Sequence, residues 1–342
     1  MKRRIISVAA IVGLTLLVMI LLILSAGADP LKAVSAFGIG VFGSTTGFAE
    51  TFVKATPIIL VSLGVAVSFQ TGFFNIGGEG QFYMGALASA FIALRATFIP
   101  GILRIIVCII AAVLAGAIWA LIPALMKTKL RISETVSTIM MNYIALMILG
   151  IVIRGPLQEE GSSFPQTAQV DKSARLLQLW MPTRLHFGII LAVVSSIAVW
   201  FIMKRSILGF EMRMAGSNQR CSACVGLPVS RSLLLAAAIG GGLAGMAGMS
   251  ELLGVQYRLL EGLSSGVGYT GVLIALLAGN HPIGVLIVSL IYAFFQTGAN
   301  TMQRNIGVPS AIVQIVTGVI VLLMLSQALI DKLRNRKEGA RV

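Results

Sequence analysis

Long uncharged runs of apolar residues alternate with short polar or basic breaks along the chain. Runs of about 20 residues have the length that a helix needs to cross the hydrocarbon core of a membrane. Because lipid offers the backbone no hydrogen-bond partners, each run predicts a transmembrane helix. The runs are 5–24, 55–78, 80–94, 105–126, 135–153, 185–203, 232–250, 262–303 and 305–330.

The run 262–303 carries no formal charge and is too long for one crossing. It contains the turn-forming sequence GNHP at 279–282, which divides it into two helices. We therefore predict an all-α integral membrane protein with about ten transmembrane helices. A single transmembrane domain would cover residues 1–335, and 336–342 would be a basic tail.

The positions of Lys and Arg predict the orientation of these helices. Of the 26 basic residues, 16 fall in the segments 1–4, 127–134, 204–231 and 331–342. Cytoplasmic loops are enriched in Lys and Arg, so we expect both termini in the cytoplasm and the protein in the bacterial cytoplasmic membrane. The loop 154–184 would then be external and the loop 204–231 cytoplasmic.

Composition agrees with a membrane protein and excludes one soluble function. Hydrophobic residues make up 57% of the chain and charged residues 11%, about half of what a soluble domain carries. The net charge of +14 is spread over the ends of apolar runs, without the basic stripe of a nucleic-acid-binding protein. The N-terminus resembles a secretory signal, but its apolar stretch exceeds a signal h-region and predicts an uncleaved anchor.

The strongest local feature is the segment 70–81, which places four glycines, three amides and one carboxylate between two apolar runs. Glycines permit unwound backbone, which survives at membrane depth only against protein or a watery cavity. We predict that Asn75, Glu79 and Gln81 line a polar solute path, with Phe73 or Phe74 available to stack on a ring. The alternative is a plain cytoplasmic turn, with Glu79 solvated at a helix N-terminus.

Several catalytic and cofactor sites are excluded. No Gly-Lys dipeptide occurs, so the chain has no P-loop, and any ATP must be hydrolysed by another subunit. The segment 262–266 matches the nucleophile-elbow pattern, which needs a strand–turn–helix setting and a His partner. The chain has two histidines, His186 and His281, and the predicted topology places His186 outside and His281 inside. Three cysteines form no disulfide framework, and no metal site is predicted. We therefore expect no catalytic residue and no cofactor in this chain.

Three acidic residues leave one alternative function open. Glu79, Glu134 and Glu251 could relay ions in an ion-coupled secondary transporter, although Glu134 and Glu251 lie at predicted helix ends. The stripe of small residues at 240–248 is typical of closely packed membrane helices. Whether it packs within or between subunits cannot be predicted from the pattern.

Four ordered motifs resemble the permease subunits of nucleoside and simple-sugar ABC importers, the branch related to ribose permease. The segment GFFNIGGEGQ at 72–81 is similar to the signature of that family, and RISETVSTIMMNYI at 131–144 to the segment that opens its fifth span. The segments MRMAGSN at 212–218 and GLPV at 226–229 are similar to the family's cytoplasmic loop. The segments NHP at 280–282 and GVP at 307–309 are similar to its C-terminal spans.

The resemblance implies a second permease subunit, two cytoplasmic ATP-binding subunits that use ATP and magnesium, and an extracytoplasmic lipoprotein that delivers nucleoside. It makes 204–231 the coupling loop that docks on the ATPase, through Glu211, Arg213, Ala215, Gly216, Ser217 and Asn218. Asn142 joins Asn75, Glu79 and Gln81 as a candidate path-lining group. The loop departs from the family pattern at Ser217, Cys221 and Cys224, which puts the choice of partner in doubt.

Overall fold

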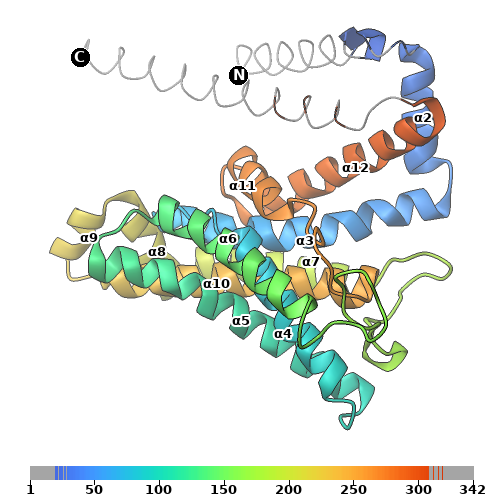
Figure 1. Cartoon of the computed structure of the whole chain (residues 1–342). Coiled ribbons are helices and arrows are strands. Elements are labelled where there is room, and N and C mark those ends of the chain that lie inside the picture. The colour runs from blue at the N-terminus through green and yellow to red at the C-terminus, as the bar shows by residue number, and fades with distance from the viewer. Residues whose placement is uncertain are drawn as a thin grey trace, which may run out of the picture. The chain divides into compact units, whose positions relative to one another are not determined.

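The computed structural model describes residues 29–307, with isolated positions 20, 21, 23–25, 27, 311, 315 and 318 beside them. The predicted first crossing 5–24 and last crossing 305–330 lie almost wholly outside these residues, and both termini and the tail 336–342 lie wholly outside. Chain contacts divide the protein into two compact units, one holding Met1–Thr51 with Tyr292–Val342 and the other Phe52–Ile291. Figure 1 shows the helices of both.

The smaller unit contains helix α2 (Pro30–Phe42), which the hydropathy pattern did not predict. The side chain of Asp29 accepts a hydrogen bond from Leu31 N, and Pro30 occupies the first turn. This Asp-Pro pair is a helix-start signal that sequence analysis could have used. Phe37 of α2 packs edge-on against Phe294 at 5.4 Å between ring centroids.

Most of the predicted runs in the described residues form helices. Six described helices, one of them continued by the π-helical segment η2, are long and apolar enough to cross a membrane. The six are α3 (Thr45–Gln70), α5 (Gly101–Leu130), α6 (Glu134–Ile153), α7 (Gly188–Arg205), α10 (Val229–Glu251) with η2 (Leu252–Gln256), and α12 (Pro282–Ile306). The other elements are α4 (Gly78–Arg95), the short 3-10 helix η1 (Lys172–Ala174), α8 (Ile207–Ser217), α9 (Gln219–Cys224) and α11 (Val267–Leu277).

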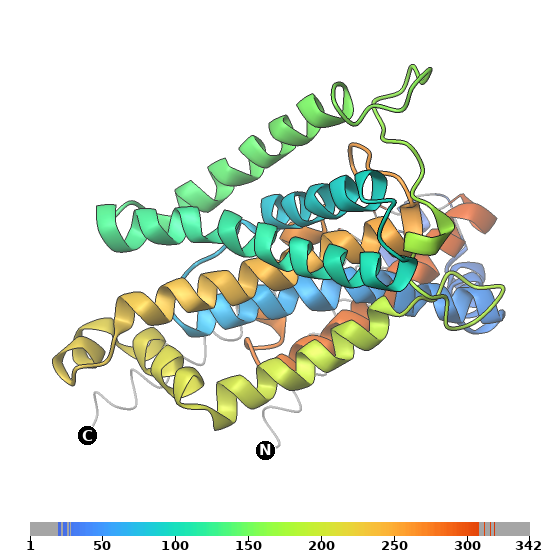
Figure 2. The same cartoon turned by 90° about the horizontal axis from the view of Figure 1, so that it is seen from below.

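Helix α10 forms the centre of this unit, alongside α4 and α5 (Figures 1 and 2). Its small residues allow backbones to touch. A Cβ added at Gly245 would lie 2.2 Å from the carbonyl oxygen of Ala112, and one added at Gly248 would lie 2.0 Å from that of Phe82. The stripe at 240–248 therefore packs within the chain, as close helix contact in lipid requires.

Two predicted crossings differ from the helices observed. The run 55–78 ends as a helix at Gln70, and the chain is non-helical until α4 begins at Gly78. The crossing expected at 262–279 is reduced to α11, whose 11 residues span about 16 Å, roughly half of a hydrocarbon core. The residues before α11 turn instead, because Gly262, Ser265 and Gly266 adopt positive φ.

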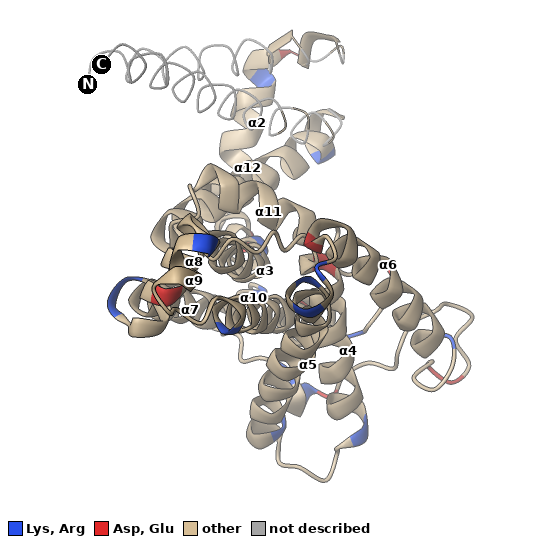
Figure 3. Ribbon diagram, turned by 90° about the vertical axis from the view of Figure 1, so that its left-hand side faces the viewer, with Lys and Arg blue, Asp and Glu red and all other residues tan. Residues whose placement is uncertain are grey.

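Side-chain contacts join helix ends and loops that are distant in the sequence. Gln70 at the end of α3 donates its side-chain amide to the carbonyl of Asn280, so the end of α3 meets the turn before α12. Arg104 of α5 and Asp171 of the loop 154–184 form an ion pair at 3.3 Å. The ribbon of Figure 3 marks the Lys, Arg, Asp and Glu positions by colour, and many of them lie at helix ends and in the connections between helices.

The loop 154–184 packs onto the segment that follows α10. Backbone N–H groups of Thr167, Val170 and Leu176 donate to carbonyls of residues 259, 257 and 253 at 2.8–3.0 Å. Arg258 forms an ion pair with Glu159 across the same contact. The loop is therefore tied to the chain segment that leads into α11.

Candidate functional site

The non-helical segment 71–77 returns from the end of α3 toward the middle of the bundle. Gly72 adopts a φ of +78°, a conformation that glycine tolerates best. Gly78, where α4 begins, lies against Val61, since a Cβ added there would be 3.1 Å from the Val61 side chain. Val61 precedes Gln70 by nine residues, so α4 begins about 13 Å from the end of α3.

The first turn of α4 is therefore buried, and its free N–H groups need partners inside the protein. Asn75 and Asn142 supply them. The Asn75 Oδ1 atom accepts Gly77 N at 2.9 Å, and the Asn142 Oδ1 atom accepts Gly80 N at 2.8 Å. The amide nitrogen of Asn142 donates in turn to the carbonyl of Ile76 at 3.0 Å.

Gln81 completes this amide cluster. Its Nε2 atom donates to Asn75 Oδ1 at 3.0 Å, and its Oε1 atom accepts from Asn75 Nδ2 at 3.2 Å. Asn75, Gln81 and Asn142 are all buried. Paired amides satisfy one another away from water, so the cluster fixes the unwound segment to α4 and α6.

Glu79 links the start of α4 to the start of α11. Its carboxylate accepts the hydroxyl of Ser264 and the backbone N–H of Gly268, the latter at 2.8 Å. A carboxylate at a helix N-terminus is stabilised by the exposed N–H groups and the helix dipole. Glu79 is buried, so the alternative of a solvated turn residue is wrong in this structure.

The two phenylalanines of the segment have different surroundings. Phe73 is 0% exposed, packs among Ala120, Ala124 and Leu233, and has Lys127 Nζ 5.7 Å above its ring. Phe74 is 53% exposed and contacts the ring of Phe69. Of the two aromatic rings expected to meet a solute, the structure leaves only Phe74 accessible.

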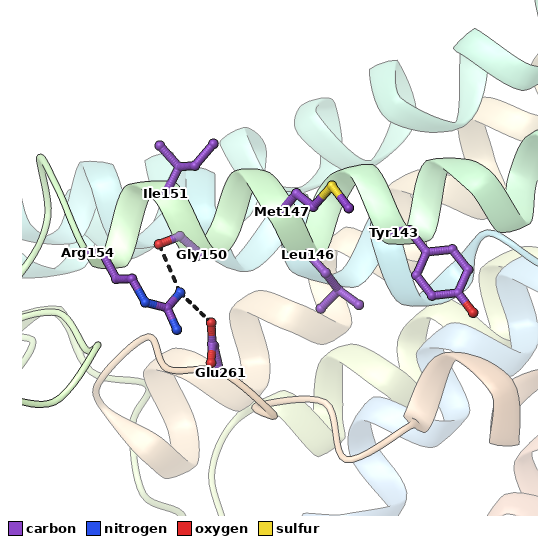
Figure 4. Close-up of a pocket in the computed structure, with 7 residues that line it drawn as sticks. All are labelled: Tyr143, Leu146, Met147, Gly150, Ile151, Arg154 and Glu261. Atoms are coloured by element: carbon purple, nitrogen blue, oxygen red, sulfur yellow. Dashed lines mark hydrogen bonds and ion pairs between the residues drawn. The ribbon is translucent and has the colours of Figure 1, made fainter.

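An open cavity of about 820 Å³ lies along α6 on the side of the segment 261–269 (Figure 4). Its wall is apolar, from Leu146, Met147 and Ile151, and Tyr143 closes one end. At the other end Arg154 and Glu261 form an ion pair at 2.6 Å.

Tyr143 follows Asn142 in α6, so the cavity ends beside the amide cluster. The exposed Tyr269 of α11 lies close to both residues. The structure therefore joins a polar buried centre to an open, partly apolar cavity, although the predicted path residues Asn75, Glu79, Gln81 and Asn142 are buried and paired with protein groups.

Tyr143, Arg154, Glu261 and Ser264 were not among the predicted site residues. Tyr143 follows the predicted path residue Asn142 within the segment 131–144, so a local signal existed for it. Arg154 and Glu261 are 107 positions apart, and no local pattern pairs them.

The predicted coupling loop folds into α8 and α9 and contacts the unwound segment. A Cβ added at Gly216 would lie 2.0 Å from the carbonyl oxygen of Gln70, so α8 touches the end of α3. Lys127 bridges the same region, donating to the carbonyl of Gly72 at 2.8 Å and pairing with Glu134 at 2.6 Å.

The other predicted coupling residues lie on or beside these helices. Glu211 and Arg213 are partly exposed on α8, Ala215 is buried, and Ser217 is exposed. Asn218 caps α9 by accepting Cys221 N at 3.1 Å.

Comparison with known proteins identifies the chain's relatives. Residues 47–325 match the family described as branched-chain amino acid transport system / permease component. The chain is 36% identical to the guanosine ABC transporter permease protein NupP of Bacillus subtilis, over 97% of this chain and 96% of that protein.

Two further relatives are named for different substrates. The chain is 31% identical to the nucleoside ABC transporter permease protein NupB of Lactococcus lactis, over 91% of this chain and 88% of that protein. It is 30% identical to the glucose ABC transporter permease protein TsgB13 of Haloferax volcanii, over 90% and 83%. No solved structure matches the chain.

Proposed function

The chain belongs to the family described as branched-chain amino acid transport system / permease component, and from this premise we propose that it carries nucleosides, or related simple sugars, across a bacterial cytoplasmic membrane. It is a multi-pass permease of the ABC transporter class. The cavity beside α6 is the observation that supports the proposed cargo, because it combines an apolar wall with polar groups at both ends.

A nucleoside has an apolar ring system and a polar sugar, and the cavity offers groups for each. Its volume of about 820 Å³ lies in the range of small-molecule sites. In the proposal, Tyr143 contacts the ring, while Arg154 and Glu261 bond the hydroxyl groups when their own pairing opens. Phe74 would contact the cargo further along the path, near Asn75 and Asn142.

The driving force would come from partner subunits, since we propose that two cytoplasmic ATP-binding subunits hydrolyse ATP with magnesium. They would press on α8, which contacts Gln70 through Gly216. Movement there reaches the unwound segment and the first turn of α4, where Asn142 and Glu79 are bonded. A second permease subunit and an extracytoplasmic substrate-binding lipoprotein complete the proposed importer.

Uptake by the complete transporter in proteoliposomes tests the proposal. Labelled guanosine, other nucleosides, ribose and glucose would be compared in the wild type, Tyr143→Ala, Arg154→Gln and Glu261→Gln. We expect nucleoside uptake to fall about tenfold or more in Tyr143→Ala, since an aromatic contact and its buried area are lost. Val136→Ala, on an exposed part of α6 outside the cavity, is the matched control.

Two results would contradict the proposal. Unchanged uptake in all three variants would remove the cavity from the path. Transport that collapses with an uncoupler while ATP is held constant would favour the ion-coupled carrier instead.

A further inference from the structure

A second pocket, of about 290 Å³, lies at the end of the larger unit that carries α8, and the nucleoside path does not use it. It is bounded by the last residues of α3 and α7, by α8, and by the turn before α12. The side chains that matter for its chemistry are Gln70, Trp200, Lys204, Arg213 and His281.

The charge of this pocket is positive. Lys204 and Arg213 supply two cations, His281 adds an imidazole, and none of the residues that line it is acidic. The Nη1 atom of Arg213 is buried and has no hydrogen-bond partner among the described residues. A buried charged donor without an acceptor is costly, so the site favours an anion.

The start of α12 adds to this preference. Pro282 opens the helix beside the pocket, and the positive end of the helix dipole attracts negative charge. Gly284 N donates to His281 Nδ1 at 3.4 Å. Because Nδ1 is the acceptor, the proton of the neutral imidazole is on Nε2, which makes that nitrogen a second donor.

Trp200 places the pocket near the border between lipid and water. Tryptophan is enriched at that border, and Lys204 Nζ lies 5.8 Å over the Trp200 ring. Basic pockets between membrane helices bind lipid head groups.

We propose that Lys204, Arg213 and His281 hold a phosphate group, either of an anionic phospholipid head group or of a soluble phosphate. The group would join the ends of α7 and α8 to the start of α12. It would also lie next to the α3 end that α8 contacts.

Native mass spectrometry of the purified, delipidated transporter complex tests the site. Phosphatidylglycerol, phosphatidylcholine and inorganic phosphate would be added separately, and phosphate also in competition with phosphatidylglycerol. We expect tight retention of one phosphatidylglycerol per permease, weakened about fivefold in Lys204→Gln and again in Arg213→Gln, the usual contribution of one basic residue. Arg205→Gln, next to Lys204 but outside the pocket, should bind like the wild type.

The lipid and phosphate arms separate the two sources. If phosphatidylglycerol stays bound when phosphate is added, the group belongs to a lipid. If phosphate binds and phosphatidylglycerol adds no further binding, the group belongs to a soluble anion. Lys204 is exposed, so its substitution leaves the fold intact and keeps the test decisive. Absence of both ligands, or equal binding by Lys204→Gln and the wild type, overturns the proposal.

Discussion

Asn142 accepts the backbone N–H of Gly80 at 2.8 Å, which fixes the first turn of α4 to the middle of α6. The same side chain donates to the carbonyl of Ile76 on the unwound side of the break. One amide therefore satisfies both the helical and the non-helical part of the segment. Any change in the angle between α4 and α6 has to break or move this pair.

We predict that Asn142→Leu destabilises the permease. The substitution leaves Gly80 N–H and the Ile76 carbonyl buried without partners, at about 1–3 kcal/mol for each group. Thermal unfolding of the purified protein in detergent should show a clear drop in Tm. Met140→Leu, a substitution of similar size on the exposed part of α6, is the control, and equal Tm values for the two variants would contradict the assignment.

Glu79→Gln should uncouple α11 from α4. A neutral amide loses the charge-assisted bonds from Ser264 and Gly268, each worth about 1.5–3 kcal/mol. The amide NH2 group of the glutamine would also face one of these two donors, which leaves that donor without an acceptor. We expect uptake to fall about tenfold, with ATP hydrolysis by the partner subunits retained. Ser89→Ala, another buried polar residue of α4, should keep near-normal uptake. Normal uptake by Glu79→Gln would show that the carboxylate is dispensable.

Gly216→Ala should separate coupling from cargo binding. The added methyl group would overlap the carbonyl oxygen of Gln70, and overpacking of this kind costs about 1–3 kcal/mol. We expect loss of transport together with unchanged binding of nucleoside, measured by uptake and by calorimetry on the same preparation. Gly38→Ala in α2 is the control, because nothing lies within 4 Å of its added Cβ. Wild-type transport by Gly216→Ala would exclude a role for this contact.

His186 should make stability depend on pH. It lies in the loop before α7, is 1% exposed, and accepts Gly188 N on Nδ1, while burial lowers its pKa to about 4. The unfolded chain, with a pKa near 6.5, binds more protons between these values, so stability is lost as pH falls. From pH 7 to pH 5 this loss is about 2 kcal/mol.

His186→Phe keeps a ring against Gly254 but removes the titrating group. Tm measured from pH 7 to pH 5 should therefore fall less in this variant than in the wild type. Identical slopes for His186→Phe and the wild type would contradict the prediction.

The hydropathy pattern predicted the long helices because each of them is apolar along its whole length. This property can be read from the local sequence. Glycine density is also local, so it indicated unwound backbone within 70–81, although not where α3 ends. The pattern could not show that Glu79 meets Ser264 and Gly268, because these partners are 185 and 189 positions away. The run that contains α11 carries no charge and was predicted as a full crossing, whereas the turn at Gly262, Ser265 and Gly266 shortens the helix.

The cavity illustrates the same limit. Leu146, Met147 and Ile151 have the composition of an ordinary lipid-facing helix surface, and only the position of Glu261 beside Arg154 turns that surface into the wall of a site. Phe73 and Phe74 are neighbours in sequence, yet the turn at Gly72 buries one and exposes the other. Aromatic character alone could not distinguish them.

The loop 154–184 is held to the segment after α10 largely through main-chain atoms of Thr167, Val170 and Leu176. Main-chain bonding depends little on which side chain a position carries. Residues along this loop are consequently free to diverge while its attachment is preserved. Substitutions along the loop can thus change its surface while the buried arrangement around Glu79 stays intact.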